Sequence, residues 1–548
     1  MEIREVAVIG LGTMGAGIAE VFARGGLRVT AIEADPPALA RGMEVLDSSL
    51  TRSVARGRLT AAERAEVFGR IRPAASAADA ATADLVIEVV PERMEIKRRV
   101  FEDLEQACGS NAILATNTSS LSVTAIAAGT ARPGRVVGMH FFNPAPVMGL
   151  VEVVTTVLTD PAAAETVTAL AGRLGKTPVQ VTDRAGFVAN ALLLPYLNHA
   201  VRLLETGYAS RDDIDAAVTG GIGLPMGPLT LLDLIGLDTS LSVLEVLQEE
   251  FGGQRYTPAP LLRRLTTAGR TGRKSGRGFY DYRRDDTAPQ PSSESQQNEA
   301  GASAPGTITL IDAGGDPEGE LASAIAGAGC TVSRDPAQAG ELVLVAAAAD
   351  HSVLAQARQH GRPADAVGVH LPAGLQGRAK DGVGVAELVR TPLTSAAAAA
   401  AAAALVARLG LRAVQCPDRP GFLAGALLYP HLNDAIRMVQ DGYASPADVD
   451  AAMTLGCGYP RGPVGLLDDA GLQPAVAVLS AMHRAYAEPG YAPVPLLAEL
   501  AAAGLTAAGL TAAGLAAGGL AAGGPGAGQT ADGPEPSEPG ADQAGGIN

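Results

Sequence analysis

The feature that most constrains the fold is a glycine-rich turn between a short apolar stretch and a helical pattern. Residues 6–9 are apolar, and residues 10–15 read GLGTMG. In such a turn Gly10 permits the tight bend, Gly12 lets the backbone approach a pyrophosphate, and Gly15 lets the helix pack against the strand. The helix N-terminus would direct unpaired N–H groups at the phosphates. The arrangement predicts a dinucleotide-binding unit built on a parallel sheet.

A second predicted strand follows that helix and ends in an acidic residue. Residues 28–32 form the apolar-rich strand, and Glu33 comes directly after it. A carboxylate there can accept hydrogen bonds from both ribose hydroxyls of NAD, and it would repel the 2′-phosphate of NADP. We therefore expect NAD as the cofactor.

Polar residues follow two more predicted strands. The strand at residues 84–90 runs into Glu92, and the strand at residues 113–116 runs into Asn117 and Ser119. The carboxyl ends of parallel strands meet at one edge of the sheet, where open α/β folds bind their ligands. We expect these side chains to lie at that edge.

The segment between the second strand and residue 84 has helical periodicity and carries polar and basic residues. These are Ser49, Arg52, Arg56 and Arg58. Two interpretations fit this pattern, a solvated helix face and a basic clamp for a phosphorylated substrate. The residues alone favour neither.

Two buried-looking strands further on each carry one titratable residue. His140 lies in the apolar stretch that begins at Val136, and Glu152 lies twelve positions later between valines. A polar group in such surroundings needs a partner, and each residue could be the partner of the other. A carboxylate on one ring nitrogen would raise the basicity of the opposite nitrogen, which suits a general base. A structural histidine satisfied in a turn is the alternative interpretation.

These motifs together resemble the 3-hydroxyacyl-CoA dehydrogenase family, which includes the bacterial 3-hydroxybutyryl-CoA dehydrogenases. The segments GLGTMG, NTSSL, HFFNPAPVM, VEVV and GFVAN carry the resemblance, which spans residues 1–282 without a large gap. It implies an acid/base role for His140, held by Glu152, with Ser119 and Asn190 on the substrate. It further implies NAD contacts from Glu33, Glu92, Lys97, Asn117, Asn143 and Lys274, and coenzyme A contacts from Ser49 and Arg56. Arg56 stands where relatives often carry lysine, and Ala191 where they commonly carry arginine.

Composition excludes several other classes of protein. The net charge of −16 opposes binding to a phosphate backbone, so no nucleic-acid partner is expected. The alanine tract near residues 395–404 is too weakly apolar to span a bilayer, and no membrane partner is expected. The four cysteines show no metal-ligand spacing, and no metal is expected. With a strand at the N-terminus in place of a signal peptide, these features predict a cytoplasmic protein.

The second half of the chain repeats the first in a degraded form. Residues 186–237 match residues 421–472 at an offset of 235, with 30 identities in 52 positions and no gap. The repeat predicts a second helical domain with the same fold. Gly425 replaces Asn190 in it, and the segment 272–282 (GRKSGRGFYDY) has no evident counterpart. The second copy is therefore expected to lack the chemistry of the first.

Residues 306–416 are interpreted as the matching relic of the nucleotide domain. Asp312 stands at the first glycine position, where an acid would repel a pyrophosphate. His370 and Glu387 correspond to His140 and Glu152, but the intervening chain is shorter, and the counterpart of residues 117–120 is expected to be missing. We interpret His370 and Glu387 as remnants of a site.

The fold class predicted is α/β, a Rossmann-type domain followed by an all-helical domain, with the pair repeated in degenerate form. The predicted segments are 1–183 (Rossmann), 184–282 (helical), 283–305 (linker), 306–416 (degenerate Rossmann-like), 417–504 (second helical) and 505–548 (low-complexity tail). The resemblance implies NAD-dependent oxidation of a 3-hydroxyacyl-CoA, with 3-hydroxybutyryl-CoA as the first choice, or the reverse reduction. Another NAD-linked hydroxy-acid dehydrogenase of the same fold and a non-catalytic derivative are the alternatives. Because homologous single-copy enzymes resemble dimers built through the helical domain, the two helical domains are expected to form an internal pseudo-dimer, or else a homodimer.

Overall fold

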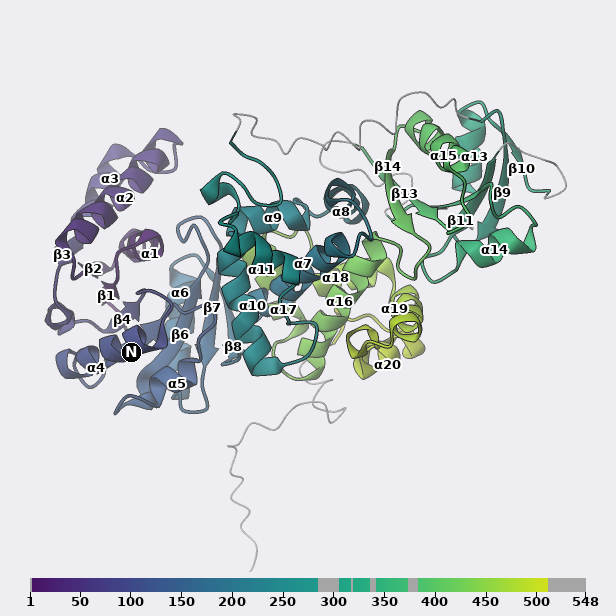
Figure 1. The fold of residues 1–548 in the computed structure, drawn as a ribbon. Coiled ribbons are helices and arrows are strands. Elements are labelled where there is room, and N and C mark those ends of the chain that lie inside the picture. The colour runs from purple at the N-terminus through teal and green to yellow at the C-terminus, as the bar shows by residue number, and fades with distance from the viewer. Residues whose placement is uncertain (1, 284–304, 317–318, 336–341, 373–382, 511–548) are drawn as a thin grey trace, which may run out of the picture.

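The computed structural model describes residues 2–283, 305–316, 319–335, 342–372 and 383–510. Within these ranges the chain forms two α/β domains with two helical domains packed between them (Figure 1). Most of the predicted linker, residues 284–304, and residues 511–548 of the predicted tail lie outside the described residues.

The first α/β domain is built on an eight-stranded sheet with the order β3-β2-β1-β4-β5-β6-β7-β8. Its strands are β1 Glu5–Ile9, β2 Arg28–Ile32, β3 Ile71–Ala74, β4 Leu85–Glu88, β5 Ile113–Thr116, β6 Val136–Phe141, β7 Leu150–Thr155 and β8 Thr177–Thr182. Neighbouring strands are parallel except for β6 and β7, where the chain direction reverses. The sequence did not predict β3, because only its two end residues are buried and Arg72 and Pro73 are exposed.

Helices cover both faces of this sheet, and the sheet side of each helix is apolar. They are α1 Thr13–Arg24, α2 Pro36–Ala55, α3 Ala61–Gly69, α4 Met94–Ala107, α5 Val123–Ala127 and α6 Pro161–Arg173. One face packs against α1, α2 and α6 in its own hydrophobic core, and the other face joins the core of the helical domains. The predicted Rossmann-type domain is therefore present.

The first helical domain begins where β8 ends and contains a π-helical turn, η3. Its elements are α7 Ala189–Glu205, α8 Arg211–Ala216, η3 Ala217–Ile222, α9 Pro228–Ile235, α10 Leu237–Phe251 and α11 Pro260–Thr267. The helices predicted from residues 188–204 and 229–235 are α7 and α9; α7 is shifted by one residue at both ends, and α9 begins one residue earlier.

The second α/β domain has a smaller, six-stranded sheet with the order β10-β9-β11-β12-β13-β14. The strands are β9 Thr307–Ala313, β10 Thr331–Ser333, β11 Leu342–Ala347, β12 Ala366–His370, β13 Val385–Arg390 and β14 Arg412–Pro417, and the helices are α13 Glu320–Gly327, α14 Val353–Gln359 and α15 Ala396–Arg408. Again a single antiparallel pairing, β12 with β13, reverses the chain direction. The reduced sheet confirms a shortened copy of the first domain.

The second helical domain repeats the first, including its π-helical turn, η5. The elements are α16 Ala424–Gln440, α17 Pro446–Ala451, η5 Ala452–Gly456, α18 Pro463–Ala470, α19 Leu472–Tyr486 and α20 Pro495–Ala503. Helix α16 packs along α7 (Figure 1). The two helical domains share one hydrophobic core. The contact predicted between the two helical domains is present. Among the described residues, no helix combines the length and apolar character that a membrane crossing requires.

Candidate active site

His140 and Glu152 face each other across the antiparallel pair of β6 and β7. The register places the two residues directly opposite, and His140 Nδ1 lies 2.7 Å from Glu152 Oε2. His140 is 7% exposed and Glu152 is fully buried. With Nδ1 bonded to the carboxylate, Nε2 is the nitrogen left to exchange a proton with a ligand. The predicted partnership is thus a close hydrogen bond.

The helical domain fixes the other carboxylate oxygen of Glu152. Glu152 Oε1 accepts hydrogen bonds from the backbone N–H groups of Val188, at 3.0 Å, and Ala189, at 3.1 Å. These amides lie at the start of α7, where unpaired N–H groups favour an anion. The preceding residue, Phe187, has a left-handed backbone (φ 48°), and its ring lies 5.6 Å from the His140 ring.

The predicted substrate residues come from both domains. Asn190 is half-buried in the first turn of α7, directly after the amides that hold Glu152. Ser119 follows β5 at the carboxyl edge of the sheet. Asn117, in the same loop, accepts a 2.8 Å hydrogen bond from the Phe141 backbone through its side-chain oxygen, next to His140. The site therefore lies where the first α/β domain meets α7.

Glu92 organises the loop after β5. Its Oε1 accepts from the Thr118 hydroxyl at 2.6 Å and from the backbone N–H groups of Ser119 and Ser120 at 3.0 and 3.1 Å. Burial alone would raise the pKa of Glu92, but Lys97 and these hydrogen bonds outweigh it and hold the pKa below its usual value. The group is therefore an anion that shapes the loop carrying Ser119.

Lys97 is buried, in a way that the sequence did not reveal. Its side chain is 1% exposed, and Nζ lies 2.8 Å from Glu88 Oε1 and 3.3 Å from Glu92 Oε2. Glu88 is fully buried and also accepts a 2.7 Å hydrogen bond from the Thr116 hydroxyl. Lys97 is thus placed to hold Glu92, and a direct contact with NAD stays a prediction. An acid inside the apolar strand at 84–90 was the signal that could have identified Glu88.

The glycine turn has the geometry that its spacing predicts. Gly10 has φ +92°, and a β-carbon there would lie 2.8 Å from the Val89 carbonyl oxygen. A β-carbon on Gly15 would collide with the Gly10 carbonyl oxygen, whereas one on Gly12 would meet nothing within 4 Å. No side chain caps α1, so its N-terminal N–H groups are free to bind a ligand anion.

Glu33 closes the same loop from the end of β2. Its carboxylate accepts a hydrogen bond from Leu11 N at 3.2 Å and is half-buried. The free helix N-terminus, the open approach at Gly12 and this acid together fit a dinucleotide with an unmodified ribose.

Some predicted residues are not shown to lie at this centre. Ser49 is half-buried on α2, and Arg56 is exposed at the end of that helix. Asn143 is exposed and precedes a cis proline peptide. Lys274 binds Asp238 at 2.6 Å within the helical domain. The contacts predicted for these residues with coenzyme A or NAD stay predictions.

In the second α/β domain a side chain takes the place of a bound anion. The Asp316 carboxylate is 5% exposed and accepts from Leu321 N at 2.9 Å and Ala322 N at 3.1 Å, in the first turn of α13. Asp312 Oδ1 accepts from Gly314 N and Asp316 N. Two acids thus occupy the region where a pyrophosphate would bind, which agrees with the prediction that this is not a phosphate loop.

The second histidine–glutamate pair keeps the register but loses the hydrogen bond. His370 and Glu387 are opposite on β12 and β13, yet His370 Nε2 lies 4.0 Å from Glu387 Oε2. His370 Nδ1 instead donates to the Ala347 carbonyl oxygen at 3.1 Å. Burial lowers the pKa of His370 to about 4 and raises that of Glu387 to about 7. A neutral imidazole without a carboxylate partner agrees with the interpretation as a remnant.

One expectation about this domain is wrong. The turn that corresponds to residues 117–120 is kept, because Asp418 caps α14 through Ser352, Val353 N and Leu354 N. Asp183 caps α5 in the same way through Ser122, Val123 N and Thr124 N. The turn survives as Ala347, Ala348, Ala349 and Asp350, so the side chains of Asn117, Thr118 and Ser119 have no polar counterpart while the backbone remains.

The closing segment of the helical domain also has a counterpart, contrary to expectation. Asp233 accepts from Phe279 N and Tyr280 N, each at 2.9 Å. Asp468, the equivalent residue, accepts from Ala507 N at 2.7 Å and Ala508 N at 2.9 Å. The second helical domain therefore continues past Gly504 through residues that were assigned to the tail. The donors in both contacts are backbone N–H groups, so the contact does not depend on the side chains. Sequence similarity therefore did not reveal the second segment.

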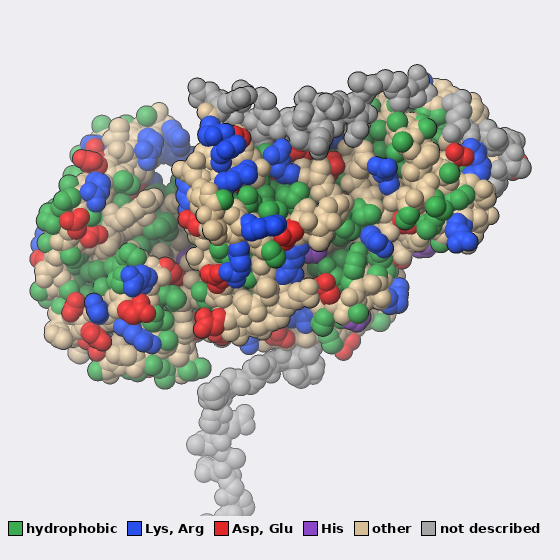
Figure 2. All heavy atoms as spheres, viewed as in Figure 1, with side chains coloured by type: hydrophobic (Ala, Val, Ile, Leu, Met, Phe, Trp, Pro, Cys, Tyr) green, Lys and Arg blue, Asp and Glu red, His purple; other side chains and the backbone are tan. Residues whose placement is uncertain are grey.

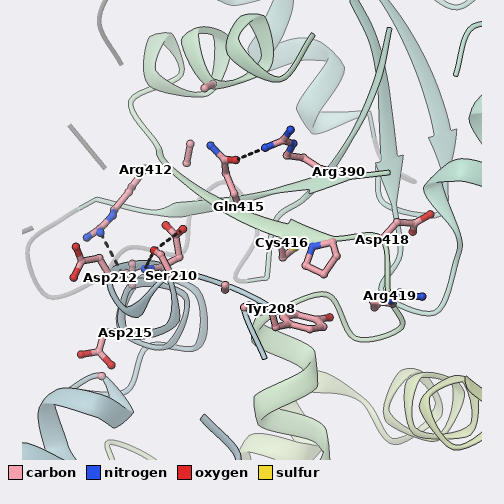
Figure 3. Close-up of a pocket in the computed structure, with 18 of the residues that line it drawn as sticks. Tyr208, Ser210, Asp212, Asp215, Arg390, Arg412, Gln415, Cys416, Asp418 and Arg419 are labelled. Atoms are coloured by element: carbon pink, nitrogen blue, oxygen red, sulfur yellow. Dashed lines mark hydrogen bonds between the residues drawn. The ribbon is translucent and has the colours of Figure 1, made fainter. Parts of the chain in front are cut away.

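A separate cavity of about 1510 Å³ lies between α8 and the strands β13 and β14. Figure 3 shows Asp212 and Asp215 on the helical side and Arg390 and Arg412 on the side of the second α/β domain. None of the predicted site residues lines this cavity. On the face shown in Figure 2, acidic and basic side chains are intermixed.

Comparison with known proteins gives one consistent family. The family model for the NAD-binding domain of 3-hydroxyacyl-CoA dehydrogenase matches residues 5–184, and the model for its C-terminal domain matches residues 186–282 and again 421–510. The second match spans the extension past Gly504.

Relatives match either the first half or nearly the whole chain. A 3-hydroxybutyryl-CoA dehydrogenase of Mycobacterium tuberculosis is 45% identical over 282 residues, 51% of this chain and 99% of that protein. A 3-hydroxyadipyl-CoA dehydrogenase of Escherichia coli is 34% identical over 511 residues, 91% of this chain and 98% of that protein. A crystal structure of 3-hydroxybutyryl-CoA dehydrogenase from Escherichia coli aligns with a TM-score of 0.76 at 33% identity, covering 92% of this chain and 99% of that one.

Proposed function

The chain belongs to the 3-hydroxyacyl-CoA dehydrogenase family of NAD-dependent oxidoreductases, and on that premise we propose that it interconverts a 3-hydroxyacyl-CoA and a 3-oxoacyl-CoA of short chain length, with 3-hydroxybutyryl-CoA as the first candidate. The observation that carries the proposal is the buried hydrogen bond between His140 Nδ1 and Glu152 Oε2, with Nε2 left for the ligand. The non-catalytic alternative has no support, because the first copy keeps the glycine turn, the histidine–glutamate hydrogen bond and Asn190, which the second copy has lost.

In the oxidation, His140 Nε2 accepts the proton of the substrate 3-hydroxyl. The imidazolium that forms is stabilised by Glu152, whose second oxygen stays bonded to the amides of Val188 and Ala189. Bound NAD supplies the acceptor for the hydride that leaves C3. In the reduction the same imidazolium returns the proton to the oxygen.

Ser119 and Asn190 are proposed to hold the oxygen that becomes the carbonyl, or the neighbouring thioester. Ser119 follows β5, the strand next to the one that carries His140, and Asn190 directly follows the Ala189 amide that binds Glu152. Removing one such donor typically costs about 3 kcal/mol of barrier, roughly a hundredfold in rate. Ser49 and Arg56 are proposed for the coenzyme A moiety, because α2 presents them at its C-terminal end.

A second substrate is also tested, because the relatives that match both copies are named for two substrates. The Escherichia coli relative that matches 91% of this chain is named for 3-hydroxyadipyl-CoA, and the Escherichia coli structure that covers 92% of it is named for 3-hydroxybutyryl-CoA. The candidate that follows is a 3-hydroxyacyl-CoA with a carboxylate at the far end of its acyl chain.

The test is NADH oxidation with acetoacetyl-CoA, longer 3-oxoacyl-CoAs and 3-oxoadipyl-CoA as substrates. Turnover with acetoacetyl-CoA is expected, and the ratio of kcat/KM values between acetoacetyl-CoA and 3-oxoadipyl-CoA decides between the two candidates. Turnover with free 3-oxo acids at the same rate as with the thioesters would overturn the assignment to coenzyme A substrates.

A further inference from the structure

The π-helical turn of the second helical domain lies against the catalytic strands of the first α/β domain. Turn η5 packs on β7. A β-carbon added at Gly149, the residue before β7, would lie 3.6 Å from Leu455 Cδ2. The next residue, Gly456, is packed more tightly. A β-carbon there would lie 2.7 Å from Leu150 Cδ2 and 3.1 Å from Phe142 Cε1.

Phe142 connects this contact to the histidine. Its ring centroid lies 4.5 Å from that of His140, and the side chain is half-buried. Gly456 of the second copy thus lies against the ring that is tilted beside the catalytic imidazole. Cys457 follows in the chain, and burial raises the pKa of its thiol to about 12, with the charge of Glu152 adding to the rise. The second copy therefore also adds an apolar neighbour within electrostatic range of Glu152.

The reciprocal contact faces the degenerate site and differs in one side chain. Turn η3 of the first helical domain packs on β13, and a β-carbon at Gly221 would lie 3.3 Å from Pro372 Cγ. Gly221 is the counterpart of Gly456, and Gly220 is the counterpart of Leu455. The intact site is thus covered by a leucine where the degenerate site is covered by a glycine.

We propose that turn η5 of the second copy positions His140 in the dehydrogenase reaction. Gly456 acts through Phe142, and Leu455 supports the same loop at Gly149. The proposal rests on the proposed function. It gives the second copy a direct part in the active site, because the wall beside the catalytic histidine is incomplete without η5. A methyl group on Gly456 would displace the Leu150 methyl group and push on the Phe142 ring, which would have to shift by a few tenths of an ångström beside His140.

The test compares Gly456→Ala with its counterpart Gly221→Ala in the full chain. The φ angle of neither glycine lies in the left-handed region, so alanine adds a methyl group without backbone strain at both positions. Gly456→Ala is expected to lower kcat for acetoacetyl-CoA by about tenfold to a hundredfold, as small displacements of catalytic groups do. The KM for NADH should stay within about twofold, and Gly221→Ala should match the wild type.

A double-mutant cycle with Phe142→Ala separates positioning from general destabilisation. Without the ring there is nothing to displace, so Gly456→Ala should add less than about a twofold further loss in that background. Equal losses from Gly456→Ala with and without Phe142, or equal kcat values for the two glycine variants, would overturn the proposal. If Gly456→Ala does not fold, Leu455→Ala gives the same decision, with a loss of kcat expected and an unchanged kcat overturning it.

Failure of the proposed dehydrogenase function can be told apart from failure of the positioning role. A wild-type chain that turns over no 3-oxoacyl-CoA refutes the function, whereas the NMR resonance of ¹³C-labelled His140 still reports its surroundings. That resonance should shift in Gly456→Ala and stay in place in Gly221→Ala. The absence of a shift in Gly456→Ala would overturn the positioning role in the same sample.

Discussion

Tyr196 and His431 occupy equivalent positions in the two helical domains, and their rings lie 5.0 Å apart. Equivalent residues can meet only beside a local two-fold axis, as in an isologous dimer. The contacts around this pair cross the same boundary, with the Tyr208 hydroxyl donating to the Phe422 carbonyl oxygen at 2.6 Å and Arg255 pairing with Asp434. The chain therefore carries within itself the kind of interface that a symmetric dimer forms between subunits.

Truncation after Tyr282 should expose the α7 face that α16 now covers. Leu192, Tyr196 and Leu197 on α7 are each 5% exposed or less in the full chain, and apolar patches of this kind associate when uncovered. We expect the truncated protein to form a homodimer or to aggregate, and the full chain to remain monomeric. Multi-angle light scattering on both proteins measures this. A soluble, active monomer from the truncated chain would show that the interface is dispensable.

The interface should weaken in acid because of His431. Burial lowers the pKa of His431 from 6.5 to about 3, and Arg255 adds to the effect. The unfolded chain therefore binds this proton near pH 6.5 and the folded chain only near pH 3. The contribution of neutral His431 to the free energy of unfolding is fully present above pH 6.5. It is lost as the pH falls, and at pH 5 the free energy of unfolding is lower by about 2 kcal/mol. His431→Gln should reduce the drop in Tm between pH 7 and pH 5.

The matched control is the exposed His351. His351→Gln should leave the pH dependence of Tm as in the wild type. If both variants lose the same acid sensitivity, or neither does, His431 does not govern it.

The two histidine–glutamate pairs should differ sharply in their effect on turnover. His140→Ala or Glu152→Ala removes the general base or its partner, and such groups contribute about 10²- to 10⁴-fold to rate. NAD binding should persist in both variants, because neither residue lies in the glycine turn. His370→Ala should leave kcat within about twofold of the wild type, since this histidine lacks the bond to its glutamate. Comparable losses from His140→Ala and His370→Ala would refute a single catalytic site.

Cofactor preference depends on Glu33. Its carboxylate would repel a 2′-phosphate, so kcat/KM with NADH should exceed that with NADPH by at least about tenfold. Glu33→Ser should narrow that gap by removing the charge. Initial rates with both cofactors at fixed acetoacetyl-CoA provide the measurement, and equal efficiency in the wild type would contradict the assignment.

Much of the first half could be predicted because its signals are local. The strand, the glycine turn and the helix are contiguous, so the roles of Gly10, Gly12 and Gly15 follow from spacing and from the conformations open to glycine. The partnership of His140 with Glu152 also followed from the residues, because a lone polar group in a buried strand must find a partner. The repeat at residues 421–472 was likewise visible without coordinates.

Other features depend on backbone groups or on residues far apart in sequence, and only the tertiary structure decided them. Asp468 binds Ala507 and Ala508 through their amides, and Asp316 caps α13 where a phosphate would bind, and neither contact requires a recognisable side-chain motif. The ion pair of Lys97 with Glu88 was missed because helix and strand patterns do not show which turn faces which strand end.

The contact of Gly456 with Phe142 is the most remote of these relationships. It joins a π-helical turn of one copy to the catalytic loop of the other, and it exists only because the two helical domains pack around a local two-fold axis. The sequence by itself determined the order of the domains, the cofactor loop and the histidine pair, since short-range periodicity and side-chain chemistry specify them. Tertiary packing alone decided which surface closes the active site, because that choice depends on how whole domains fit together.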